Sequence, residues 1–261
     1  MNPLIDSHCH IDFAQFDHDR GAILERCRKQ GMRALVVPGV TLEQWPALQS
    51  TVERFTDPAY PRLLPAYGLH PCFMDAHSSG DVDELDAWLH QGAVAVGEIG
   101  LDRFHDSSNL DRQLKLFKDQ LSVARSHHLP ILVHARKTQD LVLKLVKESG
   151  LQSGGIMHAF SGSLQQAQRA VDLGFKIGFG GAGTYDRANR IRAILRALPQ
   201  HAIVFETDAP DIAPSFAMGD RNSPENLFRI VEILAEVRQE PVDQLWSYSS
   251  KNLQELLKIT F

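Results

Sequence analysis

The sequence predicts an α/β protein that folds as a single (β/α)8 TIM barrel over residues 1–261. Short apolar runs recur along the chain and alternate with longer stretches of helical spacing, as repeated βα units require. Polar side chains follow several of these runs, at the points where the carboxyl ends of barrel strands would gather them. The length also suits one barrel, since α/β barrels have about 250 residues.

Eight apolar or β-branched runs predict the strands. In chain order they are Leu4 to His8, Ala34 to Pro38, Leu63 to His70, Ala93 to Glu98, Pro130 to His134, Gly155 to His158, Phe175 to Phe179, and Ala202 to Thr207. Several are apolar at successive positions, as Ile131, Leu132 and Val133 are. Such runs are typical of strands that are buried on both faces, which indicates a parallel sheet.

Two of the stretches between strands have clear helical spacing. One runs from Asn109 to His127 and places Leu114, Phe117 and Leu121 on a single stripe. The other runs from Pro224 to Val237, and its proline suits the first turn of a helix. Strands that alternate with helices can close into a barrel or form an open doubly wound sheet, and the local pattern does not decide between them.

Composition narrows the class of protein. The formal net charge of -5 argues against a broad basic surface for nucleic acid, although bound metal ions could still attract a phosphate. No apolar window reaches the roughly 20 residues of a membrane span, and the N-terminus lacks a signal-peptide pattern, so we expect a cytoplasmic protein without a membrane partner. Cys9, Cys27 and Cys72 form no CxxC pair, and we expect small buried side chains rather than disulfides or a cysteine zinc site.

The strongest local signal for chemistry lies near the N-terminus. His8 and His10 are two residues apart in a predicted strand, so both imidazoles point to the same face and can reach one metal ion, while Cys9 points away. Taken by itself, the pair could also be two hydrogen-bonded histidines at a strand end.

Four more candidate ligands follow apolar runs: Glu98, His134, His158 and Asp208. At the carboxyl ends of barrel strands they would converge with the two N-terminal histidines, whereas an open sheet would spread them along a line. Each one alone could be a satisfied polar group or a turn residue. Six nitrogen and oxygen ligands at corresponding points of the strands together predict a metal centre, and their positions favour the barrel.

Six side chains exceed what one tetrahedral ion needs, so the sequence predicts two divalent metal ions, and four imidazoles with two carboxylates suit Zn, Mn, Fe, Co or Ni more than Ca. The predicted arrangement has one ion at His8, His10 and Asp208, the other at His134 and His158, and Glu98 as a bridge. A bridging water with a lowered pKa would be the nucleophile, and Asp208 could take its proton. Glu98 and Asp208 are therefore the predicted catalytic residues.

Cationic and glycine-rich positions surround this predicted centre. We expect His70, Arg136 and Arg221 to bind an anionic substrate, although charged loop residues are often simply solvated. The glycines from Gly178 to Gly183 could bind phosphate through backbone amides, or tight turns alone could require them.

Taken together, these segments resemble the TatD family of metal-dependent deoxyribonucleases, within the amidohydrolase-like barrels. The resemblance runs from the first strand to the C-terminus. The segments that carry it are DSHCHID at Asp6, GLHP at Gly68, GEIGLD at Gly97, VHAR at Val133, HAFSG at His158 and ETDAP at Glu206. Glu98 occupies the bridging position where related barrels have a carboxylated lysine.

The resemblance implies the same six metal ligands, and it implies phosphodiester hydrolysis by a Mg- or Mn-dependent nuclease acting on DNA ends. Deacylation of aminoacyl-tRNA has been proposed for some members. The sequence departs from the family pattern at Arg103, Ala159 and Ser223, where an aromatic residue, cysteine and glutamate are frequent. These positions lie in loops that should touch substrate, so they bear on substrate identity more than on the reaction.

The leading prediction is a divalent-metal phosphodiesterase, an exonuclease-type deoxyribonuclease that uses a metal-bound hydroxide on single-stranded DNA ends and works as a monomer. The alternative is a hydrolase of a carboxylic ester, lactone, amide or aminoacyl-tRNA. A metal-binding scaffold fits less well, because structural zinc sites are closed and rich in cysteine. Phe104, Phe160, Tyr185 and Phe216 could stack bases or belong to the core.

Overall fold

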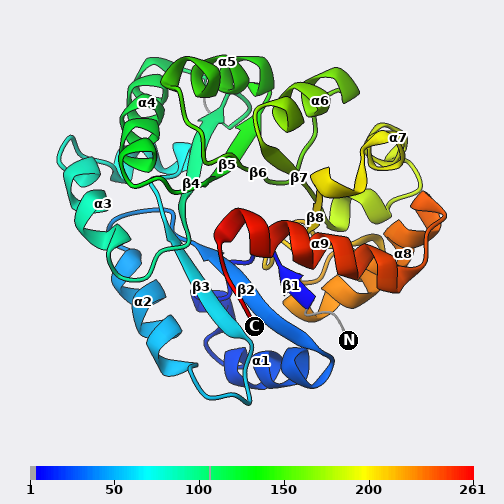
Figure 1. The fold of residues 1–261 in the computed structure, drawn as a ribbon. Helices are drawn as coiled ribbons and strands as arrows, with labels where there is room; N and C mark the ends of the chain where they lie inside the picture. Colours follow the sequence, from blue (N-terminus) through cyan, green and yellow to red (C-terminus); the bar gives the residue numbers. More distant parts are fainter. Residues whose placement is uncertain (1–3, 106) are drawn as a thin grey trace.

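Eight parallel strands form one sheet and pair in chain order in the computed structural model, which describes residues 4–105 and 107–261. Helices surround the strands on the outside (Figure 1). The strands are β1 (Leu4–Asp6), β2 (Met32–Pro38), β3 (Arg62–Tyr67), β4 (Ala95–Asp102), β5 (Ile131–Arg136), β6 (Gly155–Met157), β7 (Phe175–Phe179) and β8 (Ile203–Phe205). The predicted α/β barrel is confirmed, and β7 has the predicted bounds.

The first and last strands meet at the seam of the barrel. The backbone N–H of Ser7 donates to the carbonyl of Phe205 at 3.0 Å, and that of Asp208 donates to the carbonyl of His8 at 2.9 Å. The buried carboxylate of Asp6 adds side-chain bonds, because it accepts from the backbone N–H and the hydroxyl of Thr207 at 3.1 and 2.6 Å. These bonds fix the residues that follow β1 beside those that follow β8.

Nine helices follow or flank the strands in the part of the chain that the structure describes. They are α1 (Arg20–Lys29), α2 (Trp45–Arg54), α3 (Asp81–Leu89), α4 (Leu110–Ser126), α5 (Gln139–Ser149), α6 (Leu164–Asp172), α7 (Asn189–Ala197), α8 (Leu227–Arg238) and α9 (Val242–Leu257). Helix α4 confirms the first helix predicted. The second begins as a 3-10 turn over Pro224–Asn226, and α8 continues it. No helix in these ranges has both the length and the apolar character to cross a bilayer.

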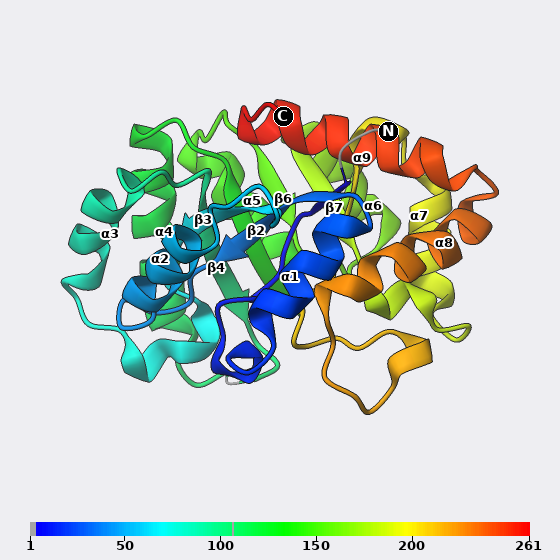
Figure 2. The same cartoon turned by 90° about the horizontal axis from the view of Figure 1, so that it is seen from below.

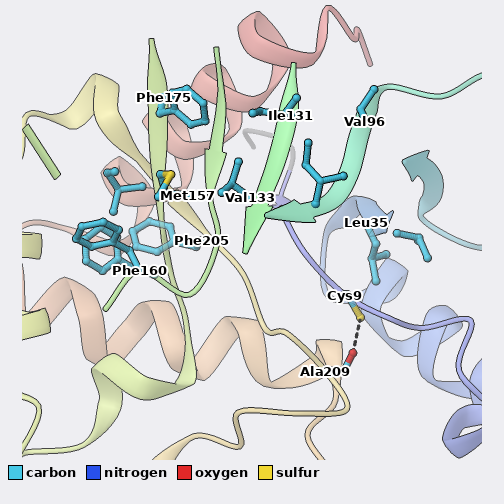
Figure 3. Close-up of a cluster of buried hydrophobic side chains, with 14 of the residues drawn as sticks. Cys9, Leu35, Val96, Ile131, Val133, Met157, Phe160, Phe175, Phe205 and Ala209 are labelled. Atoms are coloured by element: carbon cyan, nitrogen blue, oxygen red, sulfur yellow. Dashed lines mark hydrogen bonds between the residues drawn. The ribbon is translucent and has the colours of Figure 1, made fainter. Parts of the chain in front are cut away.

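Apolar side chains pack in two layers, one on each side of the sheet. Val36, Leu132 and Val204 lie in a small cluster inside the barrel, which Leu253 and Leu257 of α9 close at one end. A larger cluster lies between strands and helices, and Figure 3 shows part of it. Figure 2 shows α9 along one edge of the molecule and the loop between β8 and α8 at the opposite edge. The open end of the barrel is therefore the end that carries the loops after the strands.

Strand β4 is longer than predicted. The pairing register with β5 shifts between Val96 and Ile99, and β4 then continues to Asp102. Glu98 therefore lies within the strand, at an irregular point, and the prediction that it ends the strand is wrong. Gly97 and Gly100 interrupt the apolar run and hide this continuation in the sequence, because local pattern does not report a shift in register.

Candidate metal centre

A cavity of about 530 Å³ opens at the carboxyl ends of the strands. Five of the six predicted ligands line it together with the predicted substrate residues His70 and Arg136, and the sixth, His8, lies beneath them with its side chain fully buried. The five lining ligands are His10, Glu98, His134, His158 and Asp208. Closure of the barrel thus brings together residues that are far apart in sequence. His8 and Asp208, for example, are separated by 200 positions and lie next to each other in the centre.

One oxygen of Glu98 faces the two N-terminal histidines. The carboxylate is 2% exposed, and its Oε2 lies 3.1 Å from Nε2 of His8 and 3.6 Å from Nε2 of His10. The two Nε2 atoms are only 3.3 Å apart. Strand β1 ends at Asp6, so the pair lies after the strand and not within it as predicted, and both Nε2 atoms face the same oxygen of Glu98.

Asp208 completes this side of the centre. Its Oδ1 lies 3.6 Å from Nε2 of His8, 3.8 Å from Nε2 of His10 and 3.5 Å from Nε2 of His158. The residue follows β8 with a φ of 58°, a left-handed conformation that is uncommon for residues other than glycine. Such backbone strain is found mostly at functional sites.

The other oxygen of Glu98 faces three imidazoles. Its Oε1 lies 3.2 Å from Nδ1 of His134, 3.3 Å from Nε2 of His70 and 3.9 Å from Nε2 of His158. This buried oxygen has no hydrogen-bond partner in the part of the chain that the structure describes. His70, which the sequence suggested only as a substrate contact, therefore lies within the cluster of ligand atoms.

Charge is shared unevenly in this cluster. Burial opposes ionisation of Glu98, but the surrounding imidazoles of His70, His8 and His158 hold its pKa well below the usual value. Burial lowers the pKa values of His8 and His70 to about 4. Burial also acts on His158, but the carboxylates around it, that of Asp208 foremost, raise its pKa to about 10. Burial raises the pKa of Asp208 to about 6.

These residues fit divalent cations. A buried carboxylate oxygen without a partner is costly unless something positive satisfies it, and imidazole and carboxylate donors are what Zn²⁺, Mn²⁺ and similar ions prefer. Two groups of three could each contribute to such a site, one of His8, His10 and Glu98 and one of His8, His158 and Asp208. The donor set of the structure thus agrees with the chemistry expected from the sequence.

Comparison with known proteins identifies the family. A family model described as TatD related DNase matches residues 5–258. The chain belongs to the TatD family. It is 38% identical over 258 residues to an uncharacterized metal-dependent hydrolase of Escherichia coli K12, YjjV, with 98% of each chain covered. It is 31% identical over 263 residues to another, YabD of Bacillus subtilis 168, with 98% of this chain and 99% of the relative covered.

A solved structure supports the same assignment. The crystal structure of the E. coli YjjV protein, a TatD homologue, superposes with a TM-score of 0.92 at 37% identity and 98% coverage of both chains. The resemblance predicted from the motifs is therefore confirmed, and this chain is a metal-dependent hydrolase of the TatD family.

Two carboxylates for which the sequence predicted no role support the ligands of this TatD-family site. Oδ2 of Asp102 lies 2.8 Å from Nε2 of His134, and Oε1 of Glu206 lies 3.1 Å from Nδ1 of His158. Both carboxylates are almost fully buried. Their only signal in the sequence is their place in the GEIGLD and ETDAP segments, close to a ligand. A carboxylate behind a ligating histidine fixes the orientation of its ring and raises its basicity.

The glycines at the end of β7 and just after it allow close packing against Glu206 and the segment that follows β8. A Cβ at Gly178 would lie 2.4 Å from Oε2 of Glu206, and a Cβ at Gly180 would lie 2.7 Å from the carbonyl oxygen of the same residue. A Cβ at Gly181 would lie 2.2 Å from the carbonyl oxygen of Ile212. Close approach to the β8 segment thus explains these glycines, and the structure gives no support to a phosphate loop there.

The two arginines predicted to bind substrate differ in their surroundings. Arg136 lines the cavity, at the end of β5. Arg221 does not, because its Nη2 pairs with Oδ2 of Asp19 at 2.6 Å and its guanidinium lies over the ring of Phe16. Its charge is satisfied within the protein, by a partner that no local pattern in the sequence could reveal.

The cysteines and the candidate stacking aromatics differ in burial. Cys9 and Cys27 are buried as expected, but Cys72 is partly exposed and lines the cavity, with Sγ 3.5 Å from Oδ2 of Asp102. Phe160 belongs to the core, whereas Phe104 is 53% exposed. Phe216 is exposed on the loop between β8 and α8.

Proposed function

We propose that this chain is a divalent-metal-dependent phosphodiesterase, a deoxyribonuclease that removes nucleotides from the ends of single-stranded DNA. One observation carries the proposal: each oxygen of Glu98 faces its own set of imidazole nitrogens on the floor of an open cavity. A carboxylate that bridges two cations about 4 Å apart is the arrangement of two-metal phosphodiesterases and nucleases.

The two oxygens of Glu98 divide the residues between two ions. His8, His10 and Asp208 would hold one with Oε2, and His134 and His158 would hold the other with Oε1. His70 lies beside the second set. Bound divalent ions would supply Lewis acidity toward a phosphate oxygen and lower the pKa of an attacking water.

The chain's own residues supply proton transfer and orientation. Burial raises the pKa of Asp208 to about 6 in the metal-free protein, and we assign this carboxylate as the acceptor of the proton released during hydrolysis. Arg136, exposed at the mouth, can bind the two nonbridging oxygens of a phosphodiester through two parallel N–H donors. Asp102 and Glu206 hold the rings of His134 and His158 in place.

A phosphodiester is favoured over a carbonyl substrate for two reasons. The matching family model is described as a DNase, and the exposed Arg136 at the mouth has no carboxylate partner in the ranges that the structure covers. The same site could hydrolyse a carboxylic ester, lactone, amide or aminoacyl-tRNA. Attack on a carbonyl carbon is therefore the alternative that the experiment must exclude.

The deciding experiment follows end-labelled single-stranded DNA incubated with metal-stripped protein to which Mg²⁺, Mn²⁺ or Zn²⁺ is restored. His134→Ala and Glu98→Ala serve as variants, and a p-nitrophenyl carboxylic ester is assayed beside the DNA. We expect stepwise shortening of the DNA that requires metal and is lost in both variants. Metal-dependent cleavage of the ester without cleavage of DNA, RNA or a small phosphodiester would refute the proposal.

A further inference from the structure

A second hollow, of about 560 Å³, opens directly beside the metal cavity. It lies between the segments that follow β4, β5 and β6 and the start of α7, and it shares Arg136 and Ser161 with the cavity. Phe104, Lys137 and Arg190 line its other parts. We call this hollow the flanking groove. The two hollows therefore adjoin at Arg136 and Ser161, so a ligand longer than the metal cavity would reach the flanking groove next.

The flanking groove is cationic. Arg136, Lys137 and Arg190 line it, and its lining includes no aspartate or glutamate among the residues that the structure describes. The neighbouring arginines outside the groove differ, since Arg169 pairs with Asp140 at 2.5 Å and Arg192 pairs with Asp186 at 2.7 Å. In a chain with a formal charge of -5, three cations that pair with no carboxylate in the described ranges favour an anion as the ligand.

The three cations are exposed, and each also makes a contact within the protein. The guanidinium carbon of Arg136 lies 3.7 Å from the centroid of the Phe104 ring, and Nζ of Lys137 lies 4.7 Å from it. Nη2 of Arg190 donates to the carbonyl of Ser161 at 2.9 Å, which leaves its other donors for a ligand. Cation–π contacts of this kind favour the observed positions of the two side chains beside the ring.

The groove is also tied to the metal centre. Oδ1 of Asp102 accepts from the backbone N–H groups of Phe104 and His105, both at 2.6 Å, while Oδ2 lies 2.8 Å from Nε2 of His134. One buried carboxylate therefore fixes both a candidate metal ligand and the segment that carries the aromatic platform. The distance from the groove to the site of hydrolysis is consequently fixed.

We propose that the flanking groove binds the phosphates of nucleotides next to the scissile bond, so that the substrate is a single strand several nucleotides long. This inference rests on the proposed function and deepens it. Cationic grooves with exposed aromatics are the usual sites for single strands, since every nucleotide offers a phosphate and a stackable base. A mononucleotide-sized phosphodiester would fill only the metal cavity.

The test measures binding separately from hydrolysis. A fluorescein-labelled single-stranded DNA of twelve nucleotides is titrated with the full-length chain in EDTA, and anisotropy is recorded at several salt concentrations. Lys137→Gln combined with Arg190→Gln should weaken binding about fivefold or more and reduce the salt slope by about 0.7 for each phosphate that the variant no longer binds. Arg169→Gln, which removes one cation outside the groove, should leave affinity and slope as in the wild type and is compared with each single variant as well as with the double variant.

Several results would overturn the groove as a strand site: no binding by the wild-type chain, equal binding by the double variant, or tighter binding of RNA of the same sequence. With metal restored, the ratio of kcat/KM for the long strand to that for a dinucleotide should also fall in the double variant. If the wild-type chain binds DNA through the groove but no metal supports cleavage, the proposed nuclease fails while the groove stands.

Discussion

At the scale of single residues, the candidate site depends on buried carboxylates that orient imidazoles. Glu206 is the clearest case, since its Oε1 lies 3.1 Å from Nδ1 of His158 and also accepts from the backbone N–H of Ala159 at 2.6 Å. The Glu206→Gln substitution keeps the size and shape of the side chain but replaces one carboxylate oxygen by an NH₂ group, which donates hydrogen bonds and carries no negative charge. We expect metal affinity to fall about 10–100-fold, as for other partners of metal-bound histidines.

A chelator competition assay would measure this change in metal affinity, with Glu232→Gln on α8 as a matched surface control. A positioning role also predicts that excess metal restores most of the lost rate. Wild-type metal affinity in Glu206→Gln would contradict the role given to this carboxylate.

His158 also predicts how metal binding depends on pH. Its pKa of about 10 means that the imidazole is protonated at pH 7 in the metal-free protein, whereas a metal ligand must be neutral. Binding therefore displaces a proton, and affinity should rise as pH rises from 7 toward 10. His8, whose pKa is lowered to about 4, is already neutral at pH 7 and should release none.

Titration calorimetry of metal binding at pH 7, in two buffers of different ionisation enthalpy, counts the protons released. We expect at least about one proton per chain. The same heat in both buffers would show that no proton leaves, and the charge distribution described for His158 would then be wrong.

At the scale of elements, the seam between β1 and β8 positions His8 beside Asp208. Asp6 Oδ1 accepts from the backbone N–H groups of His8 and Thr207, both at 3.1 Å, and Oδ2 accepts from the Thr207 hydroxyl at 2.6 Å. Asp6→Ala would leave these buried donors unsatisfied, and we expect it to lower the free energy of unfolding by about 3 kcal/mol.

Urea unfolding of the metal-stripped protein measures this loss of stability. Asp6→Asn is the matched control, because its carbonyl oxygen can keep the two backbone bonds, so the loss should be smaller than for alanine. An alanine variant as stable as the wild type would mean that the seam does not depend on Asp6.

The elements also show what sequence pattern can and cannot predict. Strands that are buried on both faces consist of apolar runs, so the sequence pattern predicts the positions of all eight strands. Only two helices, α4 and α8, are predicted individually, and α9 shows what apolar spacing can miss. Its inner face is partly polar: Asn252 donates to the carbonyl of Ile203, and Ser249 accepts from the N–H of Phe205. Such bonds to strand ends are tertiary contacts, and apolar periodicity does not record them.

At the scale of the whole molecule, barrel closure explains why the convergence of the six candidate ligands could be predicted. Each follows or ends an apolar run, and only a closed ring of parallel strands brings such positions to one cavity. Other features depend on partners distant in sequence. Local sequence pattern could not predict three of these contacts: the pairing of Arg221 with Asp19, the packing of Gly178 against Glu206 and the place of His70 beside Glu98.

The same convergence predicts that metal stabilises the entire fold. Candidate ligands come from segments at or after β1, β4, β5, β6 and β8, so an ion held between them links strands around most of the barrel. Binding to the folded state alone at a free concentration about 100 times Kd adds about 2.7 kcal/mol. For a domain of this size each kcal/mol raises Tm by roughly 2–4 °C.

Differential scanning calorimetry with EDTA, and then with Zn²⁺ or Mn²⁺ restored, would measure the shift. We expect Tm to rise with metal concentration in the wild type and to change little in Glu98→Ala, where both oxygens that face the imidazoles are gone. An equal rise in the variant would place the bound metal outside this centre. The absence of a rise in the wild type would mean that the cluster gains no stability from a cation, and that the unpartnered oxygen of Glu98 is tolerated for another reason.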